Sequence, residues 1–331
     1  MSTKKILITG GAGMIGSSLT KALIHRNYDV TIIDNFWRGK IEYLNLNGKL
    51  VLPDTRIIKG DLTNPEFCIQ EIKNYDIVYH LADIVAGINY VFANQYEVWH
   101  KNILINTNVI KSSIKNNIEN LIYVGTACSY PKEKQSSVGV KPFIESDAYP
   151  AQPESSYGWS KLMGEYELLL AEENNLINAS ILRLHNVYGP PCSYDERFSQ
   201  VIPALCRKVI NYPNEPFIIW GSGKQKRAFV YIDDVIDALL ITKEKGLRNG
   251  VIQIGPDKSN SILDIAHKIV KISKKNVKID FDLSKPEGDL DRSADFSKAT
   301  EILNWKPKTS LENGLSMTYS WINNNIKNQL L

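Results

Sequence analysis

Two side chains that can move a proton lie one helical turn apart in this sequence. Tyr157 and Lys161 fall within a segment of helical periodicity, so the phenol and the ammonium group share one face of the predicted helix. A phenol is normally protonated at neutral pH, but a nearby lysine and an oxidised nicotinamide ring both favour the phenolate. Such a phenolate can take the proton of a sugar hydroxyl as a hydride leaves. The pair therefore predicts a dehydrogenase site, to which Thr126 offers a second hydroxyl.

A glycine-rich turn near the N-terminus predicts where a dinucleotide binds. Gly10, Gly13 and Gly16 directly follow an apolar run and open a helical pattern. In this context Gly13 lets the backbone approach a pyrophosphate, and Gly16 lets the helix pack closely on the strand. The N-terminus of the helix, at Met14 and Ile15, presents free N–H groups to the phosphates.

The identity of the dinucleotide follows from the end of the next apolar run. Asp34 lies 18 residues beyond Gly16, close to the spacing of about 20 at which a carboxylate accepts from the adenosine ribose. No arginine directly follows Asp34, and the carboxylate repels a ribose phosphate. The sequence therefore favours NAD over NADP as the cofactor.

These residues need a sheet to position them, and the hydrophobic pattern predicts one. Short apolar runs alternate with longer segments of helical periodicity, as in right-handed βαβ units. Because the runs are apolar on both faces, we expect a parallel sheet that is covered on both sides. The predicted strands are Lys5–Thr9, Val30–Asp34, Arg56–Lys59, Ile77–Leu81, Leu121–Gly125 and Ser180–Leu182, and the predicted helices are Met14–Arg26, Gln95–Asn116 and Tyr157–Asn174.

The fold predicted in this way is α/β, a Rossmann-type doubly wound parallel sheet with a smaller mixed α/β domain. We assign residues 1–188 to the dinucleotide-binding domain, with returns from about 225–255, and residues 189–331 to the substrate domain. After residue 189 prolines and glycines break the pattern. Helices are still expected at Asp233–Lys243, capped by aspartate, at Ser261–Ile272 and from about Leu311.

Composition excludes several other classes of protein. The chain has 331 residues, is 43% hydrophobic and 23% charged, and carries a formal net charge of +3. That charge gives no electrostatic case for nucleic acid or an anionic membrane as a partner. The apolar runs fall far short of the roughly 18–20 residues that span a bilayer. Four scattered cysteines without zinc spacing favour a reduced, cytoplasmic protein without a structural metal.

Further motifs resemble those of the extended short-chain dehydrogenases/reductases that modify nucleotide sugars, and the resemblance covers nearly the whole chain. Besides the glycine turn, Thr126 and the Tyr157/Lys161 pair, the motifs are Gly60-Asp61-Leu62, His80-Leu81-Ala82, Arg183–Pro190 and Gly221–Asp234. The resemblance implies an NAD-dependent enzyme whose cofactor also contacts Asn35, Asp61, Leu62, Leu81, Ala82, Tyr157 and Lys161.

The same resemblance implies a binding site for a nucleotide-sugar substrate. Asn186 and Arg227 are expected to hold the diphosphate, and a guanidinium in a glycine-flanked basic segment suits bidentate phosphate binding. The remaining predicted substrate contacts are Gly87, His185, Lys208 and Arg292. The family also usually forms homodimers through two helices, which are Gln95–Asn116 and Tyr157–Asn174 here. Their apolar stripes fit a homodimer, although packing in the core explains them equally well.

Within the family the motifs are most similar to those of GDP-mannose 3,5-epimerases. Thr126-Ala-Cys-Ser-Tyr-Pro131 carries this similarity, together with Pro142–Lys161 and Pro286-Glu-Gly288. Oxidation of a sugar at C4 acidifies the hydrogens on C3 and C5. Cys128, near a lysine or the charge of NAD, can then act as a thiolate base on such a hydrogen. The alternative is a buried, inert cysteine.

One departure from the epimerase pattern leaves the reaction open. The lysine that serves as the opposing acid in these epimerases falls on Gln200 here, and a glutamine cannot donate a proton as an acid at neutral pH. A group within Cys192–Arg197, such as Tyr194, substitutes for it, or the two epimerisations do not both occur. We therefore expect a 3,5-epimerase-like enzyme on GDP-mannose or a GDP-heptose. The alternatives are a GDP-sugar 4-dehydrogenase, a 4-epimerase or 4,6-dehydratase, and least of all a non-catalytic nucleotide-binding protein.

Overall fold

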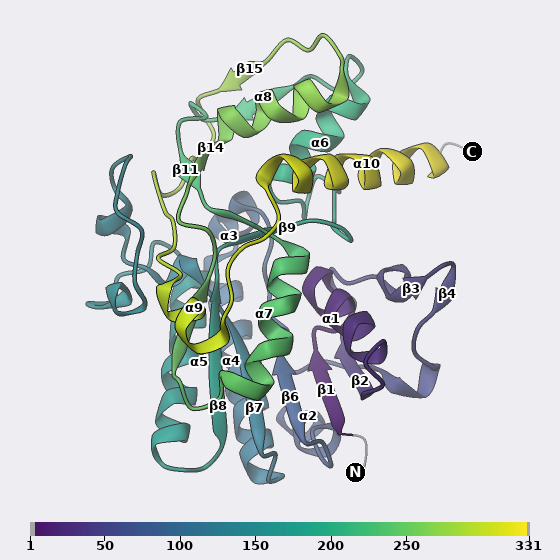
Figure 1. The fold of residues 1–331 in the computed structure, drawn as a ribbon, viewed down its shortest axis with the longest axis vertical. Coiled ribbons are helices and arrows are strands. Elements are labelled where there is room, and N and C mark those ends of the chain that lie inside the picture. Colours follow the sequence, from purple (N-terminus) through teal and green to yellow (C-terminus); the bar gives the residue numbers. More distant parts are fainter. Residues whose placement is uncertain (1–3, 330–331) are drawn as a thin grey trace.

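The computed structural model describes residues 4–329, which are built around a seven-stranded parallel sheet (Figure 1). The strand order is β13-β8-β7-β6-β1-β2-β5, and every neighbouring pair is parallel. The strands are β1 (Lys5–Thr9), β2 (Asp29–Asp34), β5 (Ile57–Lys59), β6 (Ile77–His80), β7 (Asn120–Thr126), β8 (Asn178–Leu184) and β13 (Val251–Ile254). The predicted doubly wound α/β fold is confirmed.

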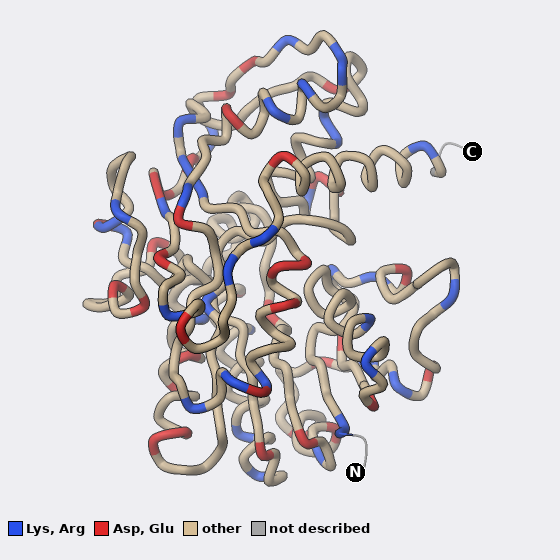
Figure 2. The backbone as a smooth tube through the Cα atoms, viewed as in Figure 1, with Lys and Arg blue, Asp and Glu red and all other residues tan. Residues whose placement is uncertain are grey.

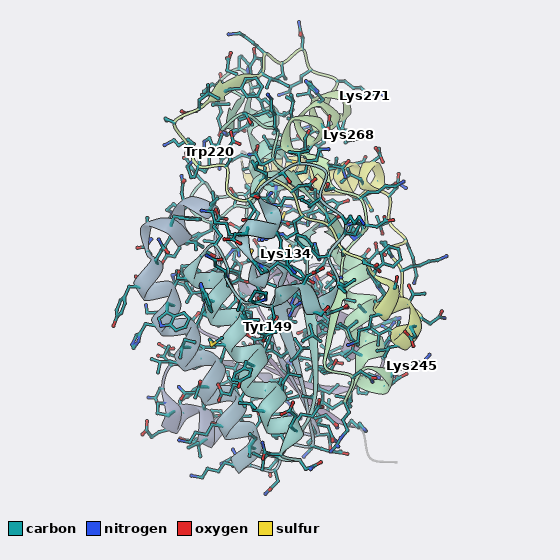
Figure 3. The ribbon with its side chains drawn as sticks, turned by 90° about the vertical axis from the view of Figure 1, so that its left-hand side faces the viewer. Lys134, Tyr149, Trp220, Lys245, Lys268 and Lys271 are labelled. Atoms are coloured by element: carbon teal, nitrogen blue, oxygen red, sulfur yellow. The ribbon has the colours of Figure 1, made fainter. Side chains whose placement is uncertain are left out.

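Helices cover both faces of this sheet, which explains why its strands are apolar on both sides. On β1, Ile6 and Ile8 pack toward α1 and α7, whereas Leu7 packs toward α2, α4 and α5. Figure 3 shows this layering from the side, with α4 and α5 on one side of the sheet and α7 on the other. The five helices are α1 (Met14–Ile24), α2 (Pro65–Glu71), α4 (Gln95–Lys115), α5 (Ser156–Glu173) and α7 (Ile232–Lys245).

A second group of elements lies beyond the carboxyl ends of the central strands (Figure 1). Its helices α6 (Val201–Asn211), α8 (Ile262–Ser273) and α10 (Leu311–Gln329) pack on one another, and α9 (Ser297–Leu303) lies beside α7 and β13. The short pairs are β9 (Asn186–Tyr188) with β12 (Phe229–Tyr231), β10 (Ile218–Trp220) with β15 (Asp280–Asp282), β11 (Lys226–Arg227) with β14 (Asn260–Ser261), and β3 (Asn45–Leu46) with β4 (Lys49–Leu50). The domain boundary near residue 188 stays a prediction.

Two features of this region differ from the sequence expectations. Helix α6 was not predicted, because a proline such as Pro203 normally interrupts helical periodicity. Pro203 is the third residue of α6, where a missing N–H costs nothing because no intrahelical acceptor is available for it. Helix α7 has Tyr231 at its N-cap rather than an aspartate, and Asp233 and Asp234 lie in its first turn. A carboxylate there is still favourable, since it faces the positive end of the helix dipole.

The apolar stripes of α4 and α5 are used within this chain. Val98, Ile105, Val109 and Leu162 are all buried in the described structure, so they provide no separate support for a subunit interface. The homodimer stays a prediction. Basic and acidic residues alternate along the backbone (Figure 2), and no helix within residues 4–329 is long and apolar enough to cross a bilayer.

The glycine turn between β1 and α1 is closed by a very tight contact. A Cβ atom at Gly16 would lie 2.1 Å from the carbonyl oxygen of Gly10 and 2.7 Å from the Cα of Gly11. Gly10 itself has a φ of +70°, which favours glycine. The prediction that Gly16 permits close packing is confirmed. Gly13 is different, because its Cβ would meet only one atom, at 3.3 Å.

We therefore expect Gly16→Ala to lower the free energy of unfolding by about 1–3 kcal/mol, because the helix must move away from the turn. Gly13→Ala is the matched control and should change it by less than about 0.5 kcal/mol. Denaturant titration of both variants checks this. Equal losses of stability would contradict the packing role of Gly16.

Candidate active site

A cavity of about 550 Å³ opens at the carboxyl ends of the central strands. This is where parallel α/β sheets bind their ligands. Its lining residues come from both groups of elements and include all but one of the predicted site residues. These are Gly10, Gly13, Met14, Ile15, Gly16, Asp34, Asn35, Asp61, Leu62, Leu81, Ala82, Gly87, Thr126, Cys128, Tyr157, His185, Asn186, Lys208, Arg227 and Arg292. The exception is Lys161, which lies behind Tyr157 with a side chain only 1% exposed.

The dinucleotide side of the cavity is organised around Asp34, at the end of β2. Its Oδ2 accepts from the N–H of Ala12 at 2.9 Å and its Oδ1 from the N–H of Phe36 at 2.7 Å. These bonds hold the carboxylate between the glycine turn and the following loop, with acceptor capacity left for a ribose diol. Burial raises the pKa of Asp34, and the backbone donors of Phe36 and Ala12 oppose this.

Two features of the structure fit the predicted dinucleotide. The first-turn N–H groups of α1, at Met14 and Ile15, have no intrahelical acceptor and lie in the cavity wall, where a pyrophosphate can accept from them. The Nζ of Lys161 is buried and has no hydrogen-bond partner among the described residues, so a cofactor hydroxyl can supply one. A bound nicotinamide would provide the hydride acceptor, and these residues would bind the dinucleotide that carries it.

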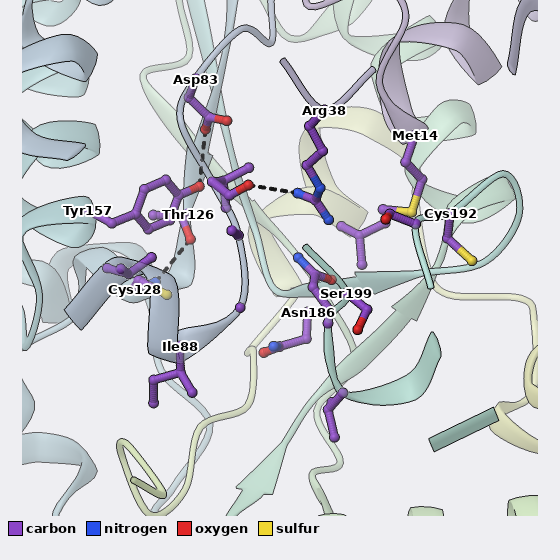
Figure 4. A pocket seen from close by; sticks show the side chains of 18 of the residues that line it. Met14, Arg38, Asp83, Ile88, Thr126, Cys128, Tyr157, Asn186, Cys192 and Ser199 are labelled. Atoms are coloured by element: carbon purple, nitrogen blue, oxygen red, sulfur yellow. Dashed lines mark hydrogen bonds between the residues drawn. The ribbon is translucent and has the colours of Figure 1, made fainter. Parts of the chain in front are cut away.

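The phenol of Tyr157 lies in the wall of the cavity, and its hydroxyl bonds to a residue that the sequence analysis missed. Its hydroxyl donates to Oδ2 of Asp83 at 3.1 Å (Figure 4). The same oxygen lies 3.4 Å from Nζ of Lys161. Burial raises the pKa of Tyr157 well above its usual value, and the carboxylate of Asp83 raises it further. A nearby lysine and an oxidised nicotinamide were expected to favour the phenolate, and the carboxylate of Asp83, which was not expected, opposes them.

Thr126 and Cys128 lie beside Tyr157 at the end of β7. The Oγ of Thr126 accepts from the N–H of Cys128 at 3.2 Å, which leaves its own hydrogen free for a substrate oxygen (Figure 4). Nη2 of Arg292 lies 3.6 Å from Sγ of Cys128. Among the described residues, the cation beside Cys128 is thus an arginine rather than the expected lysine. A guanidinium at this distance stabilises negative charge on the sulfur.

Arg292 and Arg227 place two guanidinium groups in the cavity wall, beside the carboxylates of Asp289 and Glu154. Nη1 of Arg292 donates to the carbonyl of Ala127 at 3.0 Å and lies 3.4 Å from Oδ2 of Asp289. Burial lowers the pKa of Arg292, but the negative charges of Cys128 and Asp289 outweigh this and raise it. Burial and the neighbouring Arg292 lower the pKa of Arg227 to about 10. Both guanidinium groups still carry their charge at neutral pH.

Two of the other predicted substrate residues, His185 and Lys208, make hydrogen bonds within the chain. Nε2 of His185 pairs with Oε1 of Gln253 at 3.1 Å, and burial lowers the pKa of His185 to about 3, so the imidazole is neutral. Nζ of Lys208 donates to the carbonyl of Ile218 at 2.7 Å. Asn186 begins β9, and Gly87 caps α3 (Ile88–Ala93). Their contacts with substrate stay predictions.

Gln200 cannot supply the missing acid, but Glu196, within the predicted segment Cys192–Arg197, lines the cavity. Gln200 lines the cavity as the N-cap of α6. Tyr194, the expected substitute, packs edge-on against Trp321 with ring centres 6.3 Å apart, and it is not among the lining residues. Two carboxylates that do line the wall, Glu154 and Asp289, lie close together near Arg227, and the charge of Asp289 contributes with burial to raise the pKa of Glu154.

The lining residues that the sequence analysis did not name as site residues include Arg38, Asp83, Glu154 and Asp289. Asp83 directly follows the quoted His80-Leu81-Ala82 motif, so its position was available as a signal. Arg38 was missed because only the residue after Asp34 was considered. Its Nη1 reaches the carbonyl of Val85 at 3.0 Å, on the loop that carries Asp83.

Comparisons with known proteins agree with this geometry. The NAD dependent epimerase/dehydratase family matches residues 6–255. GDP-mannose 3,5-epimerase of Arabidopsis thaliana is 30% identical over 98% of this chain and 84% of its own length. The UDP-N-acetyl-alpha-D-glucosaminuronate decarboxylase of Bacillus cytotoxicus is also 30% identical, over 96% of this chain and 97% of its own.

A solved structure shows the same fold. UDP-glucuronic acid 4-epimerase from Bacillus cereus, in complex with UDP-glucuronic acid and NAD, superposes with a TM-score of 0.83 at 30% identity and covers 99% of this chain and 100% of its own. The chain belongs to the NAD dependent epimerase/dehydratase family. It is an enzyme, and its cofactor is NAD.

The position of Asp34 predicts how the enzyme chooses between dinucleotides. We expect the wild-type protein to bind NAD at least about tenfold more tightly than NADP, and Asp34→Ser to remove most of this preference because the repelling charge is lost. Asp29→Asn is the control, since Asp29 begins the same strand and pairs with Arg56 at 2.8 Å outside the cavity. Calorimetric titration with both dinucleotides measures the ratio. An unchanged preference in Asp34→Ser would contradict the assignment.

Proposed function

We propose that the enzyme oxidises a nucleotide sugar at C4 and then inverts a neighbouring carbon with Cys128 as the base. The preferred substrate is a GDP-linked hexose or heptose of the manno series. The observation that carries this proposal is the position of Cys128, which lines the cavity with a guanidinium 3.6 Å from its sulfur. An inert, buried cysteine needs no such partner.

The residues divide the chemistry into two parts. Tyr157, with Thr126 beside it, removes and returns the proton of the C4 hydroxyl, while NAD holds the hydride. The resulting ketone acidifies the adjacent C–H bonds. Cys128, with the guanidinium of Arg292 beside its sulfur, then takes a proton from C3 or C5, and Arg227 with Asn186 anchors the diphosphate. Support for a GDP-linked substrate comes from the match to GDP-mannose 3,5-epimerase, which spans almost the whole chain.

The glutamine at position 200 favours a reaction simpler than a double inversion. With an amide where a proton donor is needed, a second proton cannot be delivered from this position. We therefore propose inversion of one centre, in which Cys128 removes the proton from one face and Glu196, which lines the cavity within the predicted Cys192–Arg197 segment, delivers one to the other face. Net 4-oxidation is the second candidate, since an enzyme without the opposing acid can stop at the 4-keto sugar.

The test is incubation of the protein with GDP-mannose, a GDP-heptose, and UDP- and dTDP-sugars in D₂O, followed by NMR and mass spectrometry. We expect deuterium at C3 or C5 of a GDP-sugar. Net NADH release without deuterium would establish the 4-dehydrogenase instead. If no sugar reacted, the proposed substrate class would be wrong.

Cys128→Ala separates the two parts of the reaction. This variant should lose deuterium incorporation by about 100-fold or more, because general acid–base groups commonly contribute 10²–10⁴-fold, while it still reduces bound NAD when sugar is added. Cys206→Ala is the matched control, as Cys206 is buried in α6 and does not line the cavity. Full exchange in Cys128→Ala would show that the cysteine is a bystander.

A further inference from the structure

Asp83 is the one carboxylate in contact with both members of the Tyr157/Lys161 pair within the described residues. It lies on the loop after β6, its side chain is 11% exposed, and its Oδ2 accepts the phenolic hydrogen at 3.1 Å. The ammonium of Lys161, only 1% exposed, lies 3.4 Å from the same oxygen. Both distances are short and both charged side chains are largely buried, unlike those of an exposed surface ion pair. The three groups form a closed cluster in the wall of the cavity.

The direction of the hydrogen bond determines what Asp83 can do. In the simplest use of a Tyr/Lys pair, the lysine favours the phenolate, and the phenolate is the base. Here the phenol is a donor, and a carboxylate already stands at the far end of its O–H bond. A phenol in this position can accept one proton while it gives up another.

We propose that Asp83 is a positioning residue that accepts the proton of Tyr157, so that the tyrosine acts as a relay between the sugar hydroxyl and this carboxylate. When a hydride leaves the carbinol carbon for the oxidised dinucleotide, the sugar O–H bond breaks and a new O–H bond forms at the phenol oxygen. The original phenol O–H bond breaks at the same time, and its proton moves to Oδ2 of Asp83. Return of the hydride reverses each transfer, and no other reactant is needed.

The surroundings of the cluster support this assignment. Four other ionisable groups face Tyr157 or Asp83: Lys161 on α5, Arg38 on the loop after β2, Cys128 after β7 and Tyr123 on β7. Lys161 and Arg38 are the two cations of this group, and the carboxylate of Asp83 attracts both of them. Burial, the carboxylate of Asp83 and the charge of Cys128 all raise the pKa of Tyr157, which keeps it a phenol until the reaction.

The test measures the titration of Tyr157 itself and needs no substrate. The ultraviolet phenolate absorption is recorded against pH for the wild-type protein and for Asp83→Asn. The signal of Tyr157 is isolated in each background by subtraction of the same protein with Tyr157→Phe, with matched NAD content. Asp237→Asn is the control, because Asp237 forms a surface ion pair with Lys308 away from the cavity.

We expect the titration of Tyr157 to move downward by about 1–3 pH units in Asp83→Asn, since a like charge at this range raises the pKa of a phenol by that amount. The control should not shift it. An unchanged midpoint would overturn the proposal. If Asp83→Asn does not fold, as judged by circular dichroism, Asp83→Ser is titrated in the same way and must show the same shift.

A second readout separates this inference from the proposed function, on whose oxidation step it rests. With a sugar that turns over, the acidic limb of the kcat/KM profile should move to higher pH in Asp83→Asn, because the phenolate of Tyr157 must then be the base, while KM changes little. A move to lower pH would show that the phenolate is already the base in the wild-type enzyme and would overturn the relay. If no sugar reacts but the titration shifts, the relay geometry stands and the proposed substrate class fails. If turnover occurs and neither the titration nor the profile shifts, the proposal for Asp83 fails alone.

Discussion

The close approach of α5 to the end of β7 places all of the reactive groups. At Gly158 a Cβ atom would lie 2.2 Å from the carbonyl oxygen of Cys128, and at Gly164 it would lie 2.5 Å from the hydroxyl of Tyr123. Only glycine fits at either position, so the helix rests directly on the strand and the turn that follows it. Because Tyr157 precedes Gly158 and Cys128 belongs to that turn, the phenol and the thiol are brought into one cavity by backbone contact.

Two clusters of charged residues lie on this framework: a carboxylate is beside Tyr157, whereas a guanidinium is beside Cys128. Around Tyr157, the carboxylate of Asp83 neutralises Lys161 and keeps the phenol protonated. Around Cys128, the guanidinium of Arg292 favours negative charge on sulfur. Buried charges of this kind are costly unless paired, so their presence beside an open cavity indicates that the chain uses them there. A protein that merely bound a nucleotide would have no need of either arrangement.

The sequence predicted features that depend on neighbouring residues, such as strand bounds and turn packing. It predicted contacts between distant segments less well. β1 has the predicted bounds and Gly16 the predicted tight packing, because periodicity and the size of one side chain decide both. The cation beside Cys128 could not be found in this way, since Arg292 reaches it from 164 residues along the chain. Asp83 was overlooked for another reason: its role depends on the direction of one hydrogen bond, which no spacing encodes.

The most direct test of the central claim is a crystal structure of the Tyr157→Phe enzyme with NAD and a GDP-sugar bound. The account predicts that the C4 hydroxyl of the sugar lies within hydrogen-bond distance of Thr126 and against the ring at position 157, with the sulfur of Cys128 facing C3 or C5. The diphosphate should lie at Arg227. A sugar ring that binds away from both α5 and the turn after β7 would contradict the account.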